Sequence, residues 1–266
     1  MLRTVRATRY VTPLREGGSL PGLVEADDDG TYVAKFSAAG QGTASLVAEV
    51  VVGELGRRLG VRVPELVVLT LDAEIAKREP DPEVQELLLA STVPNLGMDF
   101  LPRSTGYDGI AWQPPPREAA VLYWVDAFSA NIDRTWRNAN LLVWHRQLWA
   151  IDHGAALVFQ HAWPPVEAWA ARRYDLSQHV LAPVVSTLPG ADLDAVDADL
   201  AAVVTDDLLT EVLGLVPDKW LLAMNSAQAT EESRALTAAD WRARYVTYLA
   251  ARRDGGRAWR GGTVAA

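Results

Sequence analysis

The chain has 266 residues, of which 49% are hydrophobic and 22% are charged, so we expect a folded globular protein with one or two domains. Its net charge of −9 at pH 7 disfavours broad non-specific binding to nucleic acid, and the absence of cysteine excludes disulfides and thiolate metal sites. The sequence contains no run of about 18 consecutive apolar residues, so a membrane span is not expected. The arginine-bearing N-terminus does not resemble a secretory signal. We therefore expect a cytoplasmic protein.

The chain begins with a pattern typical of strands. Residues 3–12 alternate loosely, and a glycine-rich turn follows at residues 14–22. The acidic turn Asp27–Gly30 then separates a short apolar run from the strand Thr31–Phe36. Strand, acidic turn and strand predict an antiparallel hairpin.

Helical spacing of apolar residues predicts one helix in the first 70 residues, at Ser45–Leu59, with Gly60 as its C-terminal stop. A β-rich run follows at Leu66–Leu69, and the charged stretch Asp72–Glu86 predicts a short exposed helix. The apolar run Asn95–Leu101 is interpreted as the last strand of this half.

The pattern changes after the proline-rich segment Pro102–Pro116, which is interpreted as a linker or an ordered loop. Beyond it we expect an apolar helix at Glu118–Ala130 and two short strands at Leu141–Trp144 and Leu148–Ile151. From Pro165 onward the pattern is helical almost to the end.

This change of character predicts an α+β protein with a two-lobed, protein-kinase-like fold. Residues 1–103 would form a small β-rich N-lobe that binds nucleotide, and residues 104–266 a mainly helical C-lobe with catalytic and metal-binding loops. Clefts at such junctions commonly bind ligands.

Two kinds of large side chain gather in the middle of the chain. Five of the ten tryptophans are interpreted as core residues: Trp136, Trp144, Trp149, Trp163 and Trp169. Four arginines could form a local basic patch in an otherwise acidic protein: Arg134, Arg137, Arg172 and Arg173.

The chemistry of the chain is expected around Asp133 and Asn138, which are five residues apart and follow the long apolar helix. This is the spacing of a kinase catalytic loop, in which the Asp acts on the acceptor hydroxyl and the Asn binds magnesium. Asp152, in an Asp-x-Gly at the end of a short strand, would reach the same volume through the intervening hairpin. We expect Asp133 to be the base or hydroxyl-orienting group, with Asn138 and Asp152 as metal ligands and Asn140 as a rival ligand. Each Asp alone would be interpreted as a turn residue, but their order and spacing favour function.

Lys35 lies inside an apolar strand and fits the Val-Ala-x-Lys type of phosphate-binding lysine. Such a lysine needs a carboxylate partner on the next helix, where Glu49 is expected and Glu54 is the competing choice. Gly18 and Ser19 lie in the glycine-rich turn, where backbone amides could cover phosphates. The full Gly-x-Gly-x-x-Gly pattern is absent, so an ordinary hairpin loop is an equal alternative.

Other catalytic chemistries have little support. No Gly-x-Ser-x-Gly sequence and no cysteine nucleophile is present. The four histidines have no metal-ligand spacing and are interpreted as structural or surface residues: His145, His153, His161 and His179.

The chain resembles the HipA-like kinases, relatives of the bacterial HipA toxin and, more distantly, of phosphoinositide kinases. The resemblance covers about Arg6 to Phe159, and the pieces that carry it are Tyr32–Phe36, the helix with Glu49 and its end at Leu59–Glu65, Asn131–Leu142 and Ile151–Gly154. It implies a kinase-like fold, ATP and magnesium. It also implies that Met98 to Phe100 form the hinge whose backbone contacts adenine, and that Ser19 is the candidate for autophosphorylation.

Two departures separate this chain from ordinary protein kinases. His153 stands where most of them have Phe, so a switch of that aromatic ring is not expected. No Ala-Pro-Glu segment follows Gly154, so regulation and peptide docking through an ordinary activation loop are not expected either.

The leading hypothesis is ATP- and magnesium-dependent transfer of the γ-phosphoryl group to a hydroxyl, most simply Ser or Thr of a protein. A small-molecule or lipid-headgroup kinase is the second hypothesis, and a nucleotide-binding pseudokinase that acts as an interaction module is the third. The intact set of polar residues weighs against the third. An electropositive floor around Arg134 and Arg137 would suit an acidic or phosphorylated acceptor, whereas a deep pocket would suit a small molecule.

Overall fold

The computed structural model describes residues 1–14, 20–40, 42–91, 93–173, 177–227 and 235–257. The chain forms two compact units, each assembled from three segments. The first unit comprises residues 1–50, 64–102 and 215–239, and the second comprises residues 51–63, 103–214 and 240–266. Among the residues described, no helix combines the length and the apolar character that a membrane crossing requires.

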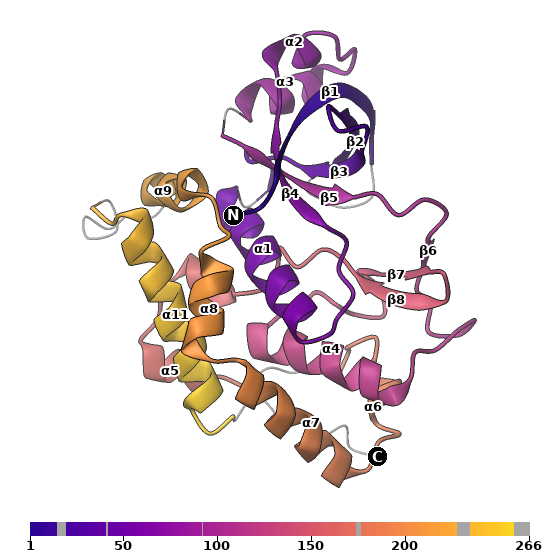
Figure 1. Cartoon of the computed structure of the whole chain (residues 1–266), viewed down its shortest axis with the longest axis vertical. Helices are drawn as coiled ribbons and strands as arrows, with labels where there is room; N and C mark the ends of the chain where they lie inside the picture. Colours follow the sequence, from indigo (N-terminus) through magenta and orange to yellow (C-terminus); the bar gives the residue numbers. More distant parts are fainter. Residues whose placement is uncertain (15–19, 41, 92, 174–176, 228–234, 258–266) are drawn as a thin grey trace. The chain divides into compact units, whose positions relative to one another are not determined.

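Five strands close a barrel in the first unit (Figure 1). They are β1 Thr4–Pro13, β2 Gly22–Ala26, β3 Thr31–Lys35, β4 Leu66–Thr70 and β5 Asn95–Asp99, and they follow one another around the barrel as β1, β2, β3, β5 and β4. All neighbours are antiparallel except β1 and β4, whose parallel pairing closes the barrel. This closing pair joins Thr4–Arg6 of β1 to Val68–Thr70 of β4. The predicted hairpin and the three predicted strands around it are confirmed.

The interior of the barrel holds the apolar core of this unit. Side chains along β2 and β3 alternate between buried and partly exposed, as expected for strands with one face inward. The buried members of the core are Val5, Ala7, Val24, Ala26, Tyr32, Ala34, Phe36, Ala39, Val67, Leu69, Ala76, Val84 and Leu88. The last three come from two short helices, α2 Ala73–Ala76 and α3 Pro82–Ala90.

The charged stretch after β4 forms these two helices, whereas one had been expected. The side chain of Asp72 caps α2 by accepting from the amide of Glu74, and Asp81 caps α3 in the same way. Pro82 follows Asp81 as the first residue of α3, where a missing amide hydrogen costs nothing. The second cap and the proline therefore start a new helix.

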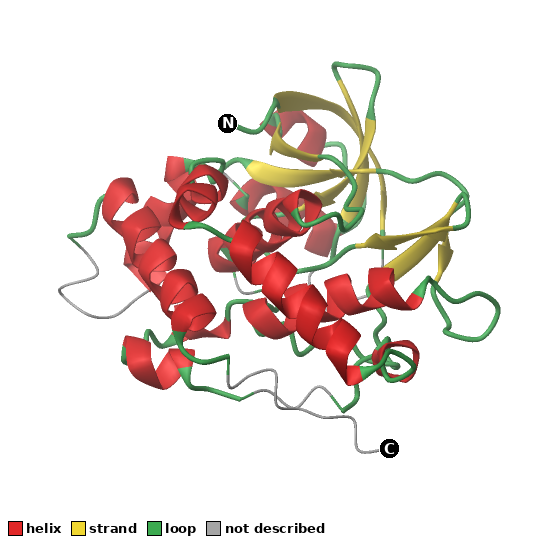
Figure 2. Ribbon diagram, turned by 60° about the horizontal axis from the view of Figure 1, so that its bottom comes forward, coloured by secondary structure: helices red, strands yellow, loops and turns green. Residues whose placement is uncertain are grey.

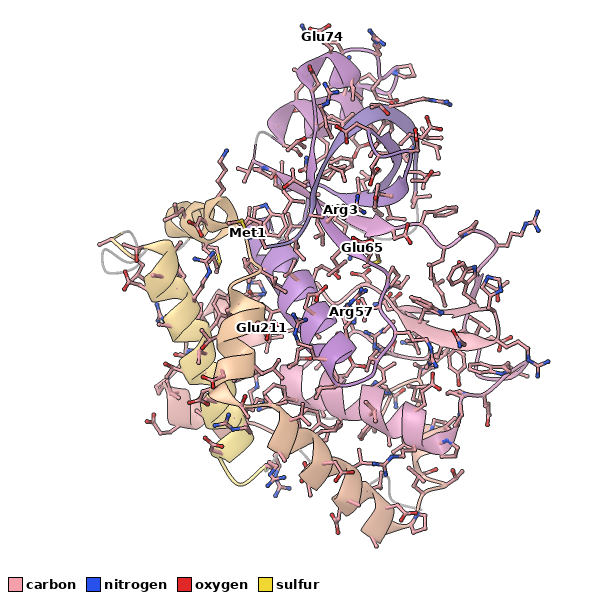
Figure 3. All side chains as sticks on the ribbon, in the orientation of Figure 1. Met1, Arg3, Arg57, Glu65, Glu74 and Glu211 are labelled. Atoms are coloured by element: carbon pink, nitrogen blue, oxygen red, sulfur yellow. The ribbon has the colours of Figure 1, made fainter. Side chains whose placement is uncertain are left out.

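The remaining elements of the first unit are the N-terminal part of α1 Thr43–Arg58 and helix α9 Asp218–Ala227. On α9 the indole of Trp220 is fully buried and donates a hydrogen bond to the carbonyl of Pro94, just before β5. At the barrel surface the guanidinium of Arg3 donates to the carboxylate of Glu65 over 3.2 Å (Figure 3).

The second unit is mainly helical and carries one small sheet (Figure 2). Its strands are β6 Thr105–Gly106, β7 Leu141–Trp144 and β8 Gln147–Ala150, with β7 in the middle and both neighbours antiparallel to it. Its helices are α4 Pro116–Ser129, the 3-10 turn η1 Val158–His161, α5 Val166–Ala170, α6 Ala182–Val185, α7 Gly190–Val203, α8 Asp206–Leu213 and most of α11 Ala238–Asp254. Strand β6 lies in the segment expected to be a linker.

A buried arginine fixes the C-terminal end of α4. The side chain of Arg252, on α11, is fully buried and donates to the carbonyls of Ala127 and Phe128 over 3.0 and 2.8 Å. The last carbonyls of a helix have no partner within it and attract cations. Arg252 therefore satisfies the end of α4, from which the predicted catalytic loop leaves.

Candidate active site

Helix α4 delivers the loop that contains Asp133. The helix ends with Ala130 in the left-handed region, with φ of 57°, which reverses the direction of the chain. The amide of Asn131 then donates back to the carbonyl of Asp126 over 2.8 Å. This cap fixes the direction in which the loop Asn131 to Asn140 starts.

A fully buried carboxylate, that of Asp126 on α4, organises the start of the loop. It accepts hydrogen bonds from Arg134 Nε at 2.6 Å, Asn131 Nδ2 at 2.8 Å and His179 Nε2 at 3.1 Å. Burial opposes ionisation of Asp126, but the charge of Arg134, the bond with His179 and the nearby His153 outweigh it and lower the pKa to about 2. Asp126 is therefore an anion that holds the loop together.

His179 is a structural histidine, as expected. Its Nδ1 accepts a hydrogen bond from the amide of Leu181 over 3.1 Å, which leaves Nε2 to carry the proton and donate to Asp126. The ring also makes an edge contact with Tyr123, with centroids 4.9 Å apart. Both contacts fix the ring of His179, whose Nε2 donates to Oδ2 of Asp126.

Arg134 connects the two predicted functional loops. Its guanidinium is buried, and Nη1 donates to the carbonyls of Asn140 and, over 3.2 Å, Ile151. The amide of Ile151 also donates to the carbonyl of Asn140 over 3.0 Å. The residue directly before Asp152 is thus bonded to the end of the loop that contains Asp133. Because Arg134 is buried and paired, it cannot contribute to the electropositive floor considered above as one of two alternatives.

The structure brings Asp133 together with both predicted amide ligands. Its Oδ2 accepts from Nδ2 of Asn138 at 2.9 Å and from Nδ2 of Asn140 at 3.2 Å. Neither bond uses the side-chain oxygen of its asparagine. Asp133 keeps a partly exposed carboxylate, so the arrangement offers several hard oxygen atoms at one place.

Asp152 follows β8 and adopts a left-handed backbone with φ of 55°. Asn140, to whose carbonyl Ile151 is bonded, is also left-handed with φ of 49°. Side chains of Asp and Asn tolerate this region better than most, and such residues cluster at functional sites. The next residue, His153, is buried. Asp152 itself is partly exposed.

In the first unit the structure pairs Lys35 with Glu49. Lys35 Nζ on β3 forms an ion pair with Oε1 of Glu49 on α1, whose side chain is fully buried. A buried carboxylate requires such a partner, because an isolated charge is strongly disfavoured away from water. The competing Glu54 instead binds Arg58 on the same helix at 2.7 Å.

The predicted hinge residues belong to the barrel. Met98 is buried in β5 and pairs with Val33 of β3 and Leu66 of β4. The amide of Phe100 donates to the carbonyl of Thr31 over 3.0 Å, and that of Asp99 also stays within the barrel. An adenine contact here would use carbonyl groups or the residues that follow. Gly18 and Ser19 lie outside the described residues.

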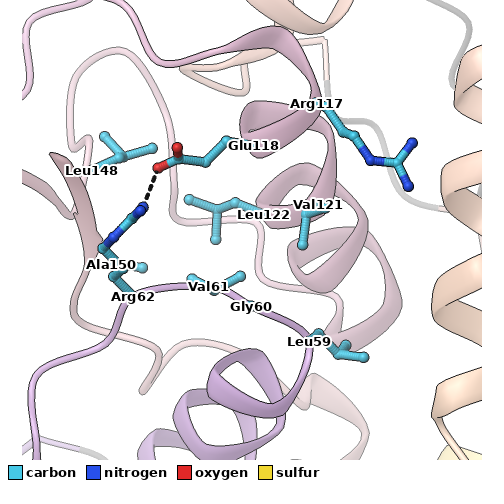
Figure 4. Close-up of a pocket in the computed structure, with 10 residues that line it drawn as sticks. All are labelled: Leu59, Gly60, Val61, Arg62, Arg117, Glu118, Val121, Leu122, Leu148 and Ala150. Carbon is cyan, nitrogen blue, oxygen red and sulfur yellow. Dashed lines mark hydrogen bonds and ion pairs between the residues drawn. The ribbon is translucent and has the colours of Figure 1, made fainter.

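The described part of the chain holds no group of three or more His, Asp or Glu side chains that could bind a metal unaided. Its second unit does contain a pocket of about 340 Å³ beside the N-terminal half of α4 (Figure 4). The walls are mostly apolar, and the ion pair between Arg62 and Glu118 crosses it with an N–O distance of 2.8 Å. None of the predicted site residues lines this pocket.

The sequence had not indicated that Asp126 and His179 support the site. The available signal for Asp126 was a lone carboxylate within the apolar run Val125 to Phe128, a position that demands a buried partner. His179 gave no such signal, because it meets Asp126 from 53 residues further along the chain.

A model of the HipA-like kinase family matches residues 8–240. The chain belongs to the HipA-like kinase family. A search of curated proteins found no match.

Solved kinase structures also match this HipA-like kinase. The proinflammatory kinase CtkA of Helicobacter pylori matches with a TM-score of 0.58 and 12% identity, covering 93% of this chain and 94% of that one. A Golgi casein kinase with Mn/ADP bound matches with a TM-score of 0.46 and 12% identity, covering 98% of this chain and 75% of that one. The first of these supports a mixed α/β kinase fold.

Proposed function

We propose that this HipA-like kinase transfers the γ-phosphoryl group of ATP, with magnesium, to the hydroxyl of Ser or Thr in a protein. The observation that carries the proposal is the bonded set of Asp133, Asn138 and Asn140 in a loop that Arg134 ties to the residue before Asp152. Phosphoryl transfer depends on positioning and charge neutralisation, and these contacts preorganise the loop for both.

Asp133 is the proposed acceptor-side residue. It would accept a hydrogen bond from the acceptor hydroxyl and take its proton as that oxygen bonds to the γ-phosphorus. The bond from this phosphorus to the leaving oxygen of ADP breaks in the same step, and the proton then passes to water. The bonds from Asn138 and Asn140 to Asp133 hold its carboxylate in one orientation for this task.

Asp152 and Asn138 are the proposed magnesium ligands, with Asn140 as the alternative to Asn138. One carboxylate and one amide oxygen suit magnesium, which keeps several waters and also binds substrate phosphates. Asn138 is exposed and Asp152 and Asn140 are partly exposed, which fits this role. Bound magnesium would neutralise charge on the phosphates and orient them.

Lys35 is the proposed phosphate-binding cation, and Glu49 is the residue that positions it. The ion pair with a fully buried carboxylate restricts the side chain of Lys35. We further propose that the first unit acts as the nucleotide-binding N-lobe of a two-lobed fold, with Gly18, Ser19, Met98 and Phe100 near the nucleotide. The predicted lobe ranges 1–103 and 104–266 and the cytoplasmic location stay predictions.

The pseudokinase hypothesis has less support. A pseudokinase commonly lacks one of the polar residues that this chain retains, and the retained residues are also in bonded arrangements. A deep pocket around Asp133 would favour a small-molecule kinase, and the transfer experiment below separates that alternative from a protein kinase.

Two experiments test the proposal. A thermal-shift titration with ATP, with and without magnesium, should show a magnesium-dependent rise in Tm. No rise at millimolar ATP would contradict the kinase proposal.

Transfer from γ-labelled ATP is measured into a lysate and, separately, into a metabolite pool, and it should label protein. Label in metabolites alone would favour the small-molecule alternative.

A further inference from the structure

Large side chains stand exposed on both sides of Asp133. Ile132 is 53% exposed and Trp136 is 62% exposed. Trp136 was expected in the core together with its neighbours, and for this residue the expectation was wrong. An indole is among the largest apolar surfaces a residue can bury, so an exposed one only three residues along the chain from Asp133 favours a binding role.

Trp136 is held in position although it is exposed. Its indole Nε1 donates to Oε1 of Gln178 over 2.9 Å, and its amide donates to the carbonyl of Gln178 over 3.3 Å. The preceding residue, Thr135, forms a β-bridge with His179. Side chains that are already ordered lose little entropy when a ligand binds, so this ring is preorganised for contact.

Arg137 adds a positive charge to the same surface. Its guanidinium carbon lies 4.6 Å from the centroid of the Trp136 ring. Within the part of the chain that the structure describes, Arg137 forms this cation–π contact and no ion pair. Arg134, the other cation of the loop, is buried against Asp126. Arg137 is thus the loop cation that an arriving acceptor can meet.

We propose that Ile132, Trp136 and Arg137 form an acceptor-docking surface for an extended polypeptide segment. The segment would carry an acidic side chain for Arg137 and an apolar side chain for Ile132 and Trp136, close to the hydroxyl that Asp133 receives. This inference rests on the proposed function and names its substrate class.

Charge supports an acidic segment. The chain has a net charge of −9, so it repels acidic peptides in general, and a local cation is needed to accept one. Size supports a polypeptide, because two large exposed side chains offer more apolar surface than a small polar metabolite can cover. Both features therefore point to the same partner.

The test uses the full chain with a positional-scanning library of Ser- and Thr-containing peptides and γ-labelled ATP. The variants are Arg137→Glu, Arg137→Gln and Trp136→Ala, and the control is Arg146→Glu, an exposed arginine in the turn between β7 and β8. Circular dichroism and Tm check folding. Kinetic constants are then measured for the best wild-type peptide.

The wild-type chain should prefer Asp or Glu at one library position. Arg137→Glu should move that preference to Lys or Arg and raise KM for the acidic peptide roughly tenfold, with little change in kcat. Arg137→Gln should have an intermediate effect. Trp136→Ala should raise KM by roughly three- to tenfold and remove the preference for apolar residues. Arg146→Glu should match the wild-type chain.

The results that overturn the inference differ from those that overturn the proposed function. If wild type and Arg137→Glu transfer phosphate to peptides with the same residue preference, the proposed docking surface is contradicted and the kinase proposal stays intact. Transfer to metabolites and none to peptides would overturn the docking surface and also the protein acceptor of the proposed function, while phosphoryl transfer from ATP would stand. No ATP-dependent transfer to any acceptor would overturn both.

Discussion

The guanidinium of Arg134 and the carboxylate of Asp126 form an ion pair, 2.6 Å between Nε and Oδ2, in which neither side chain is exposed to solvent. Arg134 continues from this pair to the carbonyls of Asn140 and Ile151, so a single buried charge fixes both ends of the candidate site. Breaking a buried pair is costly because the remaining charge has no water to solvate it.

Replacing the anion of this pair should destabilise the protein. Asp126→Asn leaves the buried Arg134 without a countercharge, and we expect the free energy of unfolding to fall by about 3 kcal/mol and Tm by roughly 6–12 °C. The measurement is thermal unfolding followed by circular dichroism. Asp199→Asn removes the exposed pair with Arg117 and is the control, expected to change stability by less than about 1 kcal/mol. Equal effects of the two variants would contradict the argument.

The same carboxylate should make stability depend on pH. The folded pKa of Asp126 is about 2, below the ordinary value of 3.8, so its stabilisation is present above pH 3.8 and is lost as pH falls toward 2. The loss is on the order of 2 kcal/mol. The measurement is the free energy of unfolding in urea between pH 2 and pH 6, taken as the difference between wild type and Asp126→Asn at each pH. A difference that stays constant over this range would contradict the assignment.

The pair of Lys35 and Glu49 should show energetic coupling. Lys35→Met leaves the fully buried Glu49 carboxylate without this partner and should lower the free energy of unfolding by about 2 kcal/mol. The double variant Lys35→Met with Glu49→Gln should be more stable than the sum of the effects of the two single variants predicts. A double-mutant cycle of urea unfolding measures the coupling, which we expect to exceed about 1 kcal/mol. The exposed pair Lys77 and Glu74 should show about 0.5 kcal/mol or less.

Gly97 should be required for packing of the barrel. A Cβ at Gly97 would lie 2.7 Å from Cγ2 of Val67 and 3.5 Å from the Tyr32 side chain. Gly97→Ala should therefore lower the free energy of unfolding by about 1–3 kcal/mol. Gly106→Ala, where a Cβ would meet nothing within 4 Å, is the matched control for the urea experiment. A Gly97→Ala variant as stable as Gly106→Ala would show that the barrel can yield at this point.

Local patterns predicted much of this structure. The hairpin around Asp27 to Gly30 and the helix that carries Glu49 follow from turn chemistry and periodicity over a few residues. The spacing of Asp133 and Asn138 placed both residues in one loop, where they are now in contact. Such features need no knowledge of distant parts of the chain.

Non-local contacts were not predictable in the same way. The parallel pairing of β1 with β4 closes the barrel between segments about 60 residues apart, and no local pattern encodes it. Arg134 was considered only as one of four arginines that could form a basic patch, yet it is buried by a carboxylate on the preceding helix and by carbonyls that follow. Trp136 was assigned to the core because tryptophan is a large apolar side chain, yet it is exposed.

The central claim is that Asp133 acts on the acceptor while Asp152 holds the metal, and the measurement that tests it most directly compares two variants in two assays. Magnesium-dependent ATP binding by calorimetry and transfer from γ-labelled ATP are measured for Asp133→Asn and Asp152→Asn, with the exposed Asp207→Asn as control. Asp133→Asn should abolish transfer and keep ATP binding within about twofold, whereas Asp152→Asn should weaken both by roughly tenfold or more. Equal loss of ATP binding in both variants, or full transfer by Asp133→Asn, would contradict the account.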